Sequence, residues 1–236
     1  MALTPRDPDE LLRDVPVLAR LPAEDVTALA QAVEMRKANR GEPLFQEGAL
    51  AEGLMVVRTG EVKLVKSAKD GREQILYLAR PGRPITEGLR FDGGTYPASA
   101  VAMRPSSVLL ISNAVISELG ERKPRVLRAM CDLRARRTDR LLALIGDLSL
   151  RTVPARLASF LCSLSAQRAA RGEDARTLVR DLTTETVAGR LGTVREEISR
   201  GLALLEREGA LKVTPDVVVI EDLERLEAIA FGSRRS

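Results

Sequence analysis

The sequence predicts an α+β protein with a β-rich N-terminal half, a long central helix and a mostly helical C-terminal part. Three observations support this fold class. Short β-type runs separated by glycines fill residues 41–111, apolar residues recur at three- and four-residue spacing over residues 124–150, and two short helices are predicted within residues 183–207. The expected parts are residues 1–122, 123–150 and 151–236.

The N-terminal half alternates short β-branched or apolar runs with turn residues. Asp70 and Gly71 form a hairpin signal, because Asp-Gly supplies the positive φ angles that a tight turn needs. Regular short strands of this kind predict a jelly-roll-like β-roll. The expected strands lie at residues 41–45, 53–57, 60–66, 75–78 and 107–111, with helices before them at about residues 9–17 and 23–33. The glycines assigned to turns are those at positions 41, 48, 60, 71 and 82.

The central segment is predicted as one long helix with an apolar stripe. The stripe comprises Val126, Met130, Leu133, Leu141, Leu144 and Leu148, and Arg137 interrupts it. Such spacing is typical of packing against the same chain or of a coiled-coil seam with a second copy. Several arginines among these leucines argue against burial on every side. Cys131 lies beside the stripe, where a packed core cysteine is more typical than a redox switch.

Two short helices around a tight turn are predicted in the C-terminal part. Thr183 and Thr184 open the first helix, and Thr193 follows Gly192 as the expected N-cap of the second. Helical periodicity gives the second helix two faces. Its polar face carries Arg195, Glu196, Ser199 and Arg200, and its apolar face carries Val194, Ile198, Leu202 and Leu205.

The polar face of the second helix has the chemistry that reads DNA bases. Arginine binds guanine O6 and N7 with two hydrogen bonds, glutamate accepts from cytosine N4, and a serine hydroxyl binds a base or a phosphate. A glycine stop at Gly209 and a predicted hairpin around Pro215 and Asp216 complete a winged helix. A merely solvated charged face is the alternative, which this context disfavours. The sequence therefore predicts a specific binder of double-stranded DNA.

This C-terminal part resembles the CRP/FNR family of bacterial transcription regulators. The family's recognition segment, Arg-Glu-x-x-Ser/Gly-Arg, is matched by Arg195, Glu196, Ser199 and Arg200. The resemblance implies a cyclic-nucleotide-binding-like β-roll in the N-terminal half and a homodimer formed through the central helix. It also implies an inverted-repeat site with TGTGA-like or TTGA-like half-sites about 34 Å apart, and RNA polymerase as a partner if the protein is an activator.

The expected effector pocket departs from the cyclic-AMP-binding members that it resembles. Its tentative residues are Glu87, Gly88, Ala98, Ser99, Leu141 and Leu142. Glu87 is kept, but Ala98 replaces the arginine that pairs with the cyclic phosphate. Arg90 and Arg104 are the alternative cations for the phosphate, although neither stands at the matching position. The two leucines replace hydroxyls that bind adenine. Because a buried phosphate needs charge-assisted hydrogen bonds, cyclic AMP is disfavoured; a small hydrophobic effector, a haem or no ligand suits the pocket.

Composition narrows the remaining cofactors. The chain has 236 residues and a net charge of +4, which mildly favours a polyanionic partner. Its two cysteines, Cys131 and Cys162, are too few and too far from the N-terminus for an FNR-like iron–sulfur cluster. Histidine is absent from the sequence, so a haem would need an unusual ligand such as Cys131, Met130 or Tyr96.

The sequence also lacks the patterns of other function classes. It contains no nucleophile–base arrangement, metal-ligand spacing or phosphate-binding loop, so neither catalysis nor a metal site is expected. It has no signal-like start and no apolar run near 18 residues, which predicts a cytoplasmic protein without membrane contact. The favoured function is an effector-controlled DNA-binding regulator. The alternatives are a cyclic-nucleotide-responsive regulator and a nucleotide-binding module that acts through protein contacts.

Overall fold

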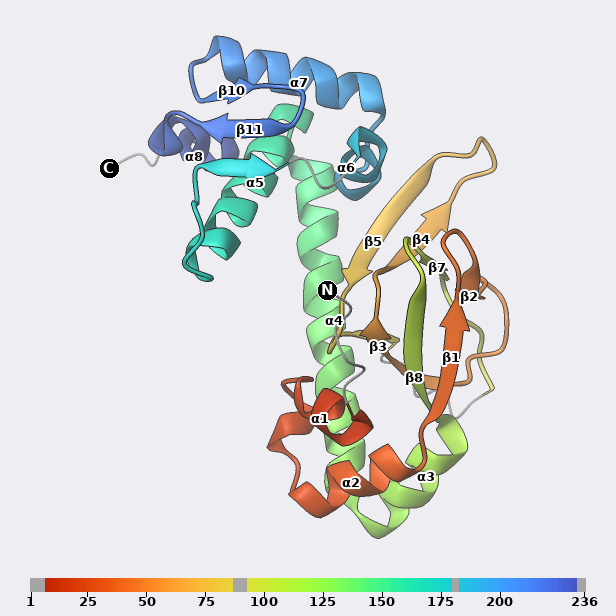
Figure 1. The fold of residues 1–236 in the computed structure, drawn as a ribbon. Coiled ribbons are helices and arrows are strands. Elements are labelled where there is room, and N and C mark those ends of the chain that lie inside the picture. The colour runs from red at the N-terminus through yellow and green to blue at the C-terminus, as the bar shows by residue number, and fades with distance from the viewer. Residues whose placement is uncertain (1–6, 87–92, 180–182, 233–236) are drawn as a thin grey trace. The chain divides into compact units, whose positions relative to one another are not determined.

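The computed structural model describes residues 7–86, 93–179 and 183–232, which form two compact units (Figure 1). The first unit comprises residues 1–66 and 76–142, and the second comprises residues 67–75 and 143–236. The first unit combines a strand-rich roll with several helices, and the second is mostly helical. The α+β class predicted from the sequence is therefore confirmed.

Two four-stranded sheets form the β-roll of the first unit. One has the strand order β1-β8-β3-β6 and the other β2-β7-β4-β5. The strands are β1 (Glu34–Ala38), β2 (Pro43–Phe45), β3 (Gly53–Thr59), β4 (Val62–Ser67), β5 (Glu73–Ala79), β6 (Pro84–Thr86), β7 (Ser99–Ala102) and β8 (Ser106–Ser112). The roll confirms the prediction, and the five predicted turn glycines all have positive φ angles.

The sequence did not indicate β1, β6 or β7. β1 is a mostly exposed edge strand with the sequence Glu-Met-Arg-Lys-Ala, and it is held by antiparallel pairing with β8. β6 and β7 have only three and four residues. Because such strands are specified by hydrogen bonds to their neighbours, their own composition gives little signal.

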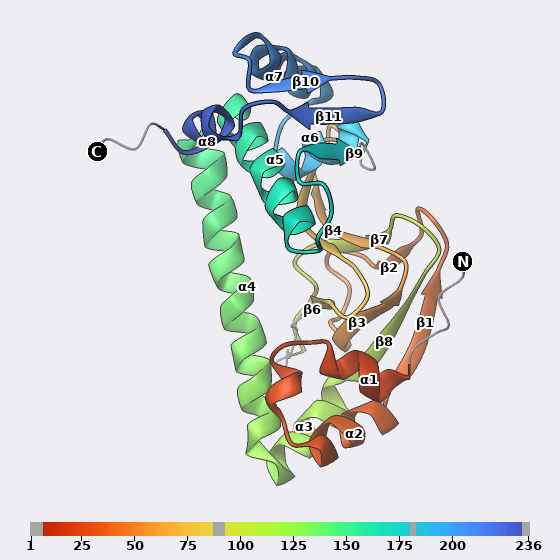
Figure 2. The same ribbon diagram turned by 60° about the vertical axis from the view of Figure 1, so that its left-hand side comes forward.

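Helices pack against one side of the roll and share a core with it (Figure 2). They are α1 (Pro8–Arg13), α2 (Ala23–Gln31), α3 (Asn113–Arg122) and the long α4 (Pro124–Leu150), with a 3-10 turn at Leu18–Arg20. The first predicted helix is shorter than expected, since α1 ends at Arg13. The core joins Leu11 of α1 and Ile116 of α3 to Leu54 and Leu109 of the roll.

The long helix has the predicted bounds, and of the two roles expected for its apolar stripe, the first part of the stripe has the intrachain one. Val126, Met130 and Leu133 are at most 3% exposed and pack in the core of the first unit. This part of the stripe is therefore intrachain core. The residues that α4 exposes lie on another face, described below.

The second unit is a helical bundle with a small sheet. Its elements are α5 (Val153–Ala169), β9 (Thr177–Val179), α6 (Thr184–Leu191), α7 (Arg195–Arg207), β10 (Leu211–Val213), β11 (Val217–Ile220) and α8 (Leu223–Phe231). The predicted hairpin is present as β10 and β11. The sequence did not indicate β9, which pairs antiparallel with β11 and gives the sheet order β10-β11-β9.

None of the helices within the described residues combines the length and apolar composition that crossing a membrane requires.

Candidate DNA-binding and effector sites

Helices α6 and α7 form a helix-turn-helix. The Thr183 hydroxyl caps α6 by accepting a hydrogen bond from the Thr186 N–H at 3.1 Å. After α6, Gly192 has the left-handed conformation, with φ of 60° and ψ of 46°. This conformation is readily adopted by glycine, which explains the residue at the turn. The predicted start of the first helix and the predicted turn are both present.

The N-cap of the second helix differs from the prediction. Helix α7 begins at Arg195, so Val194 and not Thr193 occupies the cap position, and Val194 makes no side-chain cap hydrogen bond. The Thr193 N–H instead donates to the Ala188 carbonyl at 3.0 Å, which closes the turn. Val194 is 42% exposed, so its placement on the buried face was wrong. The reason is that helical periodicity does not extend back through the turn.

Helix α7 separates its remaining side chains as the sequence predicts. Ile198 and Leu205 are buried in the core of the second unit, and Leu202 packs against it. Arg195, Glu196, Ser199 and Arg200 are all exposed. Four side chains with base-reading chemistry therefore share the solvent-facing part of the helix.

Two arginines of this face have acidic neighbours that the sequence did not single out. The Arg195 guanidinium lies 3.8 Å from the Glu185 carboxylate of α6, and Arg200 pairs with Glu197 within α7. Both arginine side chains remain more than 65% exposed. Exposed pairs contribute at most about 1 kcal/mol, so the guanidiniums can exchange these partners for DNA groups.

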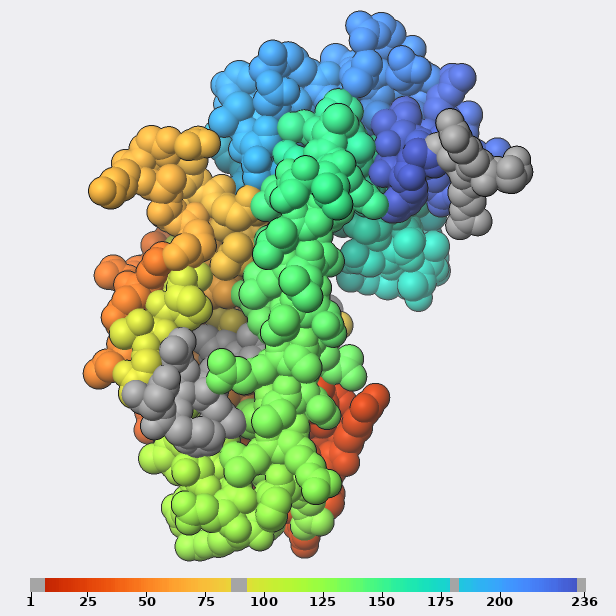
Figure 3. Space-filling model, turned by 180° about the vertical axis from the view of Figure 1, so that it is seen from behind, coloured from red at the N-terminus to blue at the C-terminus, as the bar shows by residue number. Residues whose placement is uncertain are grey.

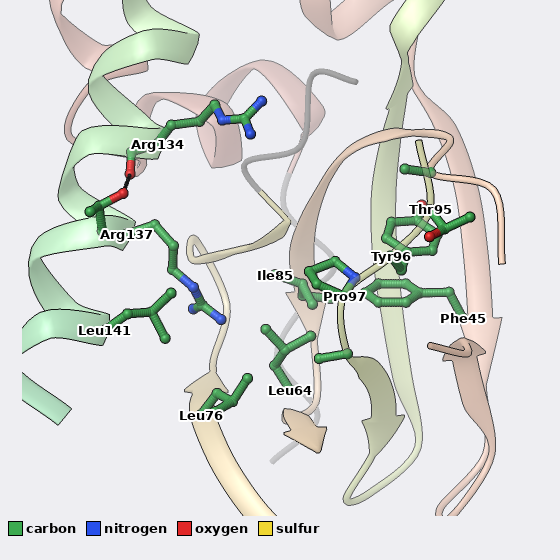
Figure 4. Close-up of a pocket in the computed structure, with 13 residues that line it drawn as sticks. Phe45, Leu64, Leu76, Ile85, Thr95, Tyr96, Pro97, Arg134, Arg137 and Leu141 are labelled. Carbon is green, nitrogen blue, oxygen red and sulfur yellow. Dashed lines mark hydrogen bonds between the residues drawn. The ribbon is translucent and has the colours of Figure 1, made fainter. Parts of the chain in front are cut away.

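A cavity of about 300 Å³ lies in the first unit, between the β-roll and α4 (Figure 4). The roll contributes Phe45, Ala51, Leu64, Leu76, Ile85, Thr95, Tyr96, Pro97 and Ala98, and α4 contributes Arg134, Arg137, Thr138 and Leu141. The roll side is mostly apolar, and the α4 side combines two arginines and a threonine with Leu141.

The aromatic part of the roll wall is fixed by stacking and by a hydrogen bond. The rings of Phe45 and Tyr96 stack at a centroid distance of 3.8 Å. The Tyr96 hydroxyl accepts from the Glu52 N–H at 2.9 Å, and burial raises the pKa of this phenol. The ring is therefore an apolar wall whose hydroxyl already has a backbone donor.

The predicted effector residues fall in different places. Ala98 is 1% exposed and, like Leu141, lines the cavity. The Ser99 hydroxyl instead accepts from the Glu47 N–H at 2.9 Å, and Leu142 is 62% exposed; neither belongs to the lining residues that are described. Glu87 and Gly88 lie outside the described residues.

Arg104, one of the two arginines considered from the sequence, is not among the described residues that line the cavity. Arg104 donates to Glu61 at 3.0 Å, and Arg80 donates to the same buried carboxylate at 2.7 Å. Arg104 is therefore committed to a structural ion pair, and Arg90 lies outside the described residues. The cations at the cavity are Arg134 and Arg137 of α4. Their three-residue spacing, which places them on one helix face, is the signal that could have identified them.

The two cysteines differ in their exposure to solvent. Cys131 is exposed on α4, so its expected burial in a core was wrong. Cys162 is partly buried, and burial together with the nearby Glu227 carboxylate raises the pKa of its thiol to about 11. Cys162 is therefore protonated at neutral pH.

Comparison with known proteins assigns both halves of the chain. Residues 35–123 match the cyclic nucleotide-binding domain, and residues 155–229 match the Crp-like helix-turn-helix domain. The chain is 30% identical to the cyclic AMP receptor protein of Thermus thermophilus, over 94% of this chain and 99% of that protein. It is 32% identical to the transcriptional activator protein anr of Pseudomonas aeruginosa, over 90% of this chain and 87% of that protein.

A solved structure of another protein has a similar fold. The solved structure of FixK2 from Bradyrhizobium japonicum matches with a TM-score of 0.70 and 24% identity, over 84% of this chain and 96% of that one. The helix-turn-helix, its exposed arginine face and the two matched domains agree with these similarities. The chain therefore belongs to the CRP/FNR family and is a DNA-binding transcription regulator.

Proposed function

We propose that the protein acts in the cytoplasm as a homodimer that binds an inverted-repeat DNA site. We further propose that an effector in the cavity of the first unit controls its affinity for that site. The observation that carries this proposal is the chemistry of the exposed face of α4.

One exposed stripe of α4, called the heptad face below, consists of uncharged residues at coiled-coil spacing. They are Cys131, Ala135, Thr138, Leu142, Ile145 and Ser149, and all are exposed. Their spacing alternates between four and three residues, which is the heptad pattern of a helix that pairs with another helix. Leu142 and Ile145 are 62% and 58% exposed, and α4 lies open on the surface seen in Figure 3. A second α4 related by a two-fold axis would cover these apolar side chains.

A two-fold dimer also accounts for specificity from so short a recognition helix. Two copies of α7 would read two half-sites about 34 Å apart. In each half-site, Arg195 and Glu196 read a G·C pair, Ser199 and Arg200 bind a base or a phosphate, and the threonines of the turn region bind the backbone. Those threonines are Thr183, Thr184 and Thr193.

An effector can influence DNA binding because α4 runs from the first unit into the second. An effector that contacts α4 differently in two dimer arrangements shifts the population between them. Cyclic AMP is disfavoured, because Ala98 occupies the position of the phosphate-binding arginine. The matched cyclic nucleotide-binding domain supports the alternative of a cyclic-nucleotide-responsive regulator.

The proposal is tested by selecting bound duplexes from a random pool with the full chain at stated salt concentrations, with and without cyclic AMP. The control is Arg195→Ala. Enrichment of an inverted repeat by the wild type but not by this variant supports the proposal. Enrichment of single half-sites contradicts the dimer, and enrichment that depends on cyclic AMP favours the alternative. If RNA polymerase is the partner of an activator, transcription from a promoter carrying the selected site will increase.

A further inference from the structure

The two walls of the α4 cavity differ in charge and polarity, and this difference defines a class of ligand. We propose that the effector is a small organic anion, such as a carboxylic acid, whose apolar body packs against the roll and whose anionic group binds Arg134 and Arg137. This inference rests on the proposed role of the cavity as the effector site. It adds the chemical class of the effector and the residues that select it.

The roll wall favours an apolar body. Leu64, Ile85 and the stacked Phe45 and Tyr96 rings are each at most 7% exposed, so they form a fixed surface. The Tyr96 hydroxyl already accepts a backbone N–H. Most of the described residues of this wall are apolar, with the hydroxyls of Thr95 and Tyr96 as its polar side-chain groups, so it suits an aromatic ring or an alkyl chain.

The α4 wall favours an anion. Arg134 and Arg137 are three residues apart, so they are neighbours on the helix surface. Each guanidinium has five N–H donors in a planar fork that matches a carboxylate, and it can bind an anion in addition to another partner. A carboxylate would gain charge-assisted hydrogen bonds from these guanidiniums that the neutral amide of the same acid would not gain.

The position of Arg137 is supported by a neighbouring aromatic ring. Its guanidinium carbon lies 5.4 Å from the centroid of the Tyr77 ring of β5, and that of Arg140 lies 5.0 Å from the same centroid. Cation–π contacts of this kind orient the side chains from α4 toward the roll. Figure 4 shows Arg137 extending from α4 toward Leu76. An anion between the roll and α4 would therefore meet a positioned donor.

The cavity volume limits the size of the ligand. About 300 Å³ is at the lower end of the range for small-molecule sites, which favours a compact acid. An anion held by α4 would also bind the same helix that carries the proposed dimer face. The ligand class thus gives the effector a direct contact with the element that is proposed to transmit the signal.

The test uses three acids of different shape, benzoate, 1-naphthoate and octanoate, and the neutral primary amide of each. Binding to the full-length protein at pH 7.5 is measured by isothermal titration calorimetry, with cyclic AMP as a further probe. The variants are Arg134→Gln and Arg137→Gln. Arg136→Gln is the matched control, because Arg136 is exposed on the same helix and is not one of the described lining residues. Circular dichroism checks that each variant is folded.

We expect at least one acid to bind about tenfold or more tightly than its amide, and each pocket variant to weaken that acid by about tenfold or more. The amides and the Arg136→Gln control should be unaffected. The inference is overturned if no acid binds, if acids and amides bind equally, if the pocket variants bind the acid like the wild type, or if cyclic AMP binds and the acids do not.

The selection of bound duplexes by the wild type distinguishes an error in the ligand class from an error in the proposed DNA-binding function. Selection of an inverted repeat without acid binding would refute only the ligand class. If an acid binds, the selection is repeated with that acid present, and no enrichment with or without it would refute the proposed inverted-repeat binding.

Discussion

Helices α4 and α7 each bury one apolar stripe, but their exposed faces differ in charge. Each buries one apolar stripe in the core of its own unit, with Met130 in α4 and Ile198 in α7 as central residues. The exposed part of α7 carries arginine, glutamate and serine side chains. The heptad face of α4 is uncharged and includes Leu142 and Ile145.

The proposed function assigns a different partner to each of these two faces. Charged side chains remain hydrated in the free protein and can exchange water for base edges and phosphates. Exposed apolar side chains at heptad spacing are instead stabilised when another apolar helix covers them. If the two faces have these separate roles, a change to one should leave the other function intact.

The largest expected effect comes from placing charge on the α4 face. The double variant Leu142→Glu and Ile145→Glu should be monomeric, because like charges would face each other across the two-fold axis. Its affinity for the inverted repeat should fall roughly 10²–10⁴-fold, since the two half-sites are no longer bound by one linked dimer. Sedimentation velocity and a DNA titration measure both effects. The control Arg136→Glu adds negative charge to an exposed position of α4 outside this face, and this variant should remain dimeric. If the double variant is also dimeric, the proposal that the dimer forms through this face of α4 is wrong.

The second effect comes from removing the arginine at the start of α7. Arg195→Ala should weaken specific DNA binding by roughly ten- to hundredfold for each half-site, the cost of one bidentate base contact. Sedimentation should still show a dimer. Arg207→Ala, an exposed residue in the last turn of the same helix, is the control and should retain specificity. Equal losses from both variants would mean that Arg195 contributes only general charge.

A smaller effect concerns the residue that fixes the first turn of α4. Asp25 is fully buried and binds Lys123 at 2.8 Å and also Arg125. Burial acts to raise its pKa, but the hydrogen bonds from the two cations outweigh it, and the pKa lies below the usual 3.8. Asp25→Asn should therefore lower the free energy of unfolding by about 1–3 kcal/mol at pH 7.

The pH dependence of this effect has a defined sign. Because the folded-state pKa of Asp25 is lowered, its stabilising contribution is present above about pH 4 and is lost as the pH falls through the folded value. Urea unfolding of the wild type and Asp25→Asn should differ at pH 7 and converge in acid. The control is Glu24→Gln, which removes an exposed carboxylate bound to the same Arg125 at 2.8 Å and should change stability little. A constant difference at all pH values would rule out the ion pair as the cause.

The smallest effect is on chemical reactivity and requires no change in fold. Iodoacetamide should label Cys131 rapidly in the monomeric double variant and slowly in the dimer, where the partner helix covers it. Cys162 should react slowly in both, because a pKa of about 11 leaves little thiolate at neutral pH. Peptide mass spectrometry measures the two rates. Fast labelling of Cys131 in the intact dimer would place this residue outside the seam.

Local pattern was sufficient for the helix-turn-helix, the hairpin that follows it and the bounds of α4. Each depends on residues close together in the chain, such as Thr183, Gly192 and the apolar series from Ile198 to Leu205. The wrong predictions concern residues whose exposure depends on the surrounding fold and not on the local pattern. Val194 continues the helical periodicity in sequence, but the turn before α7 exposes it.

The sequence by itself determined the family and the polar character of the exposed side chains of α7, and it predicted that these side chains read bases and that Ala98 stands in place of a phosphate-binding arginine. It could not decide which stripe of α4 is buried, because apolar residues and uncharged residues each recur at helical spacing on this helix. Nor could it place Arg134 and Arg137 opposite Phe45 and Tyr96. Those choices depend on contacts between segments that are far apart in the chain, and only the packing of α4 against the roll establishes them.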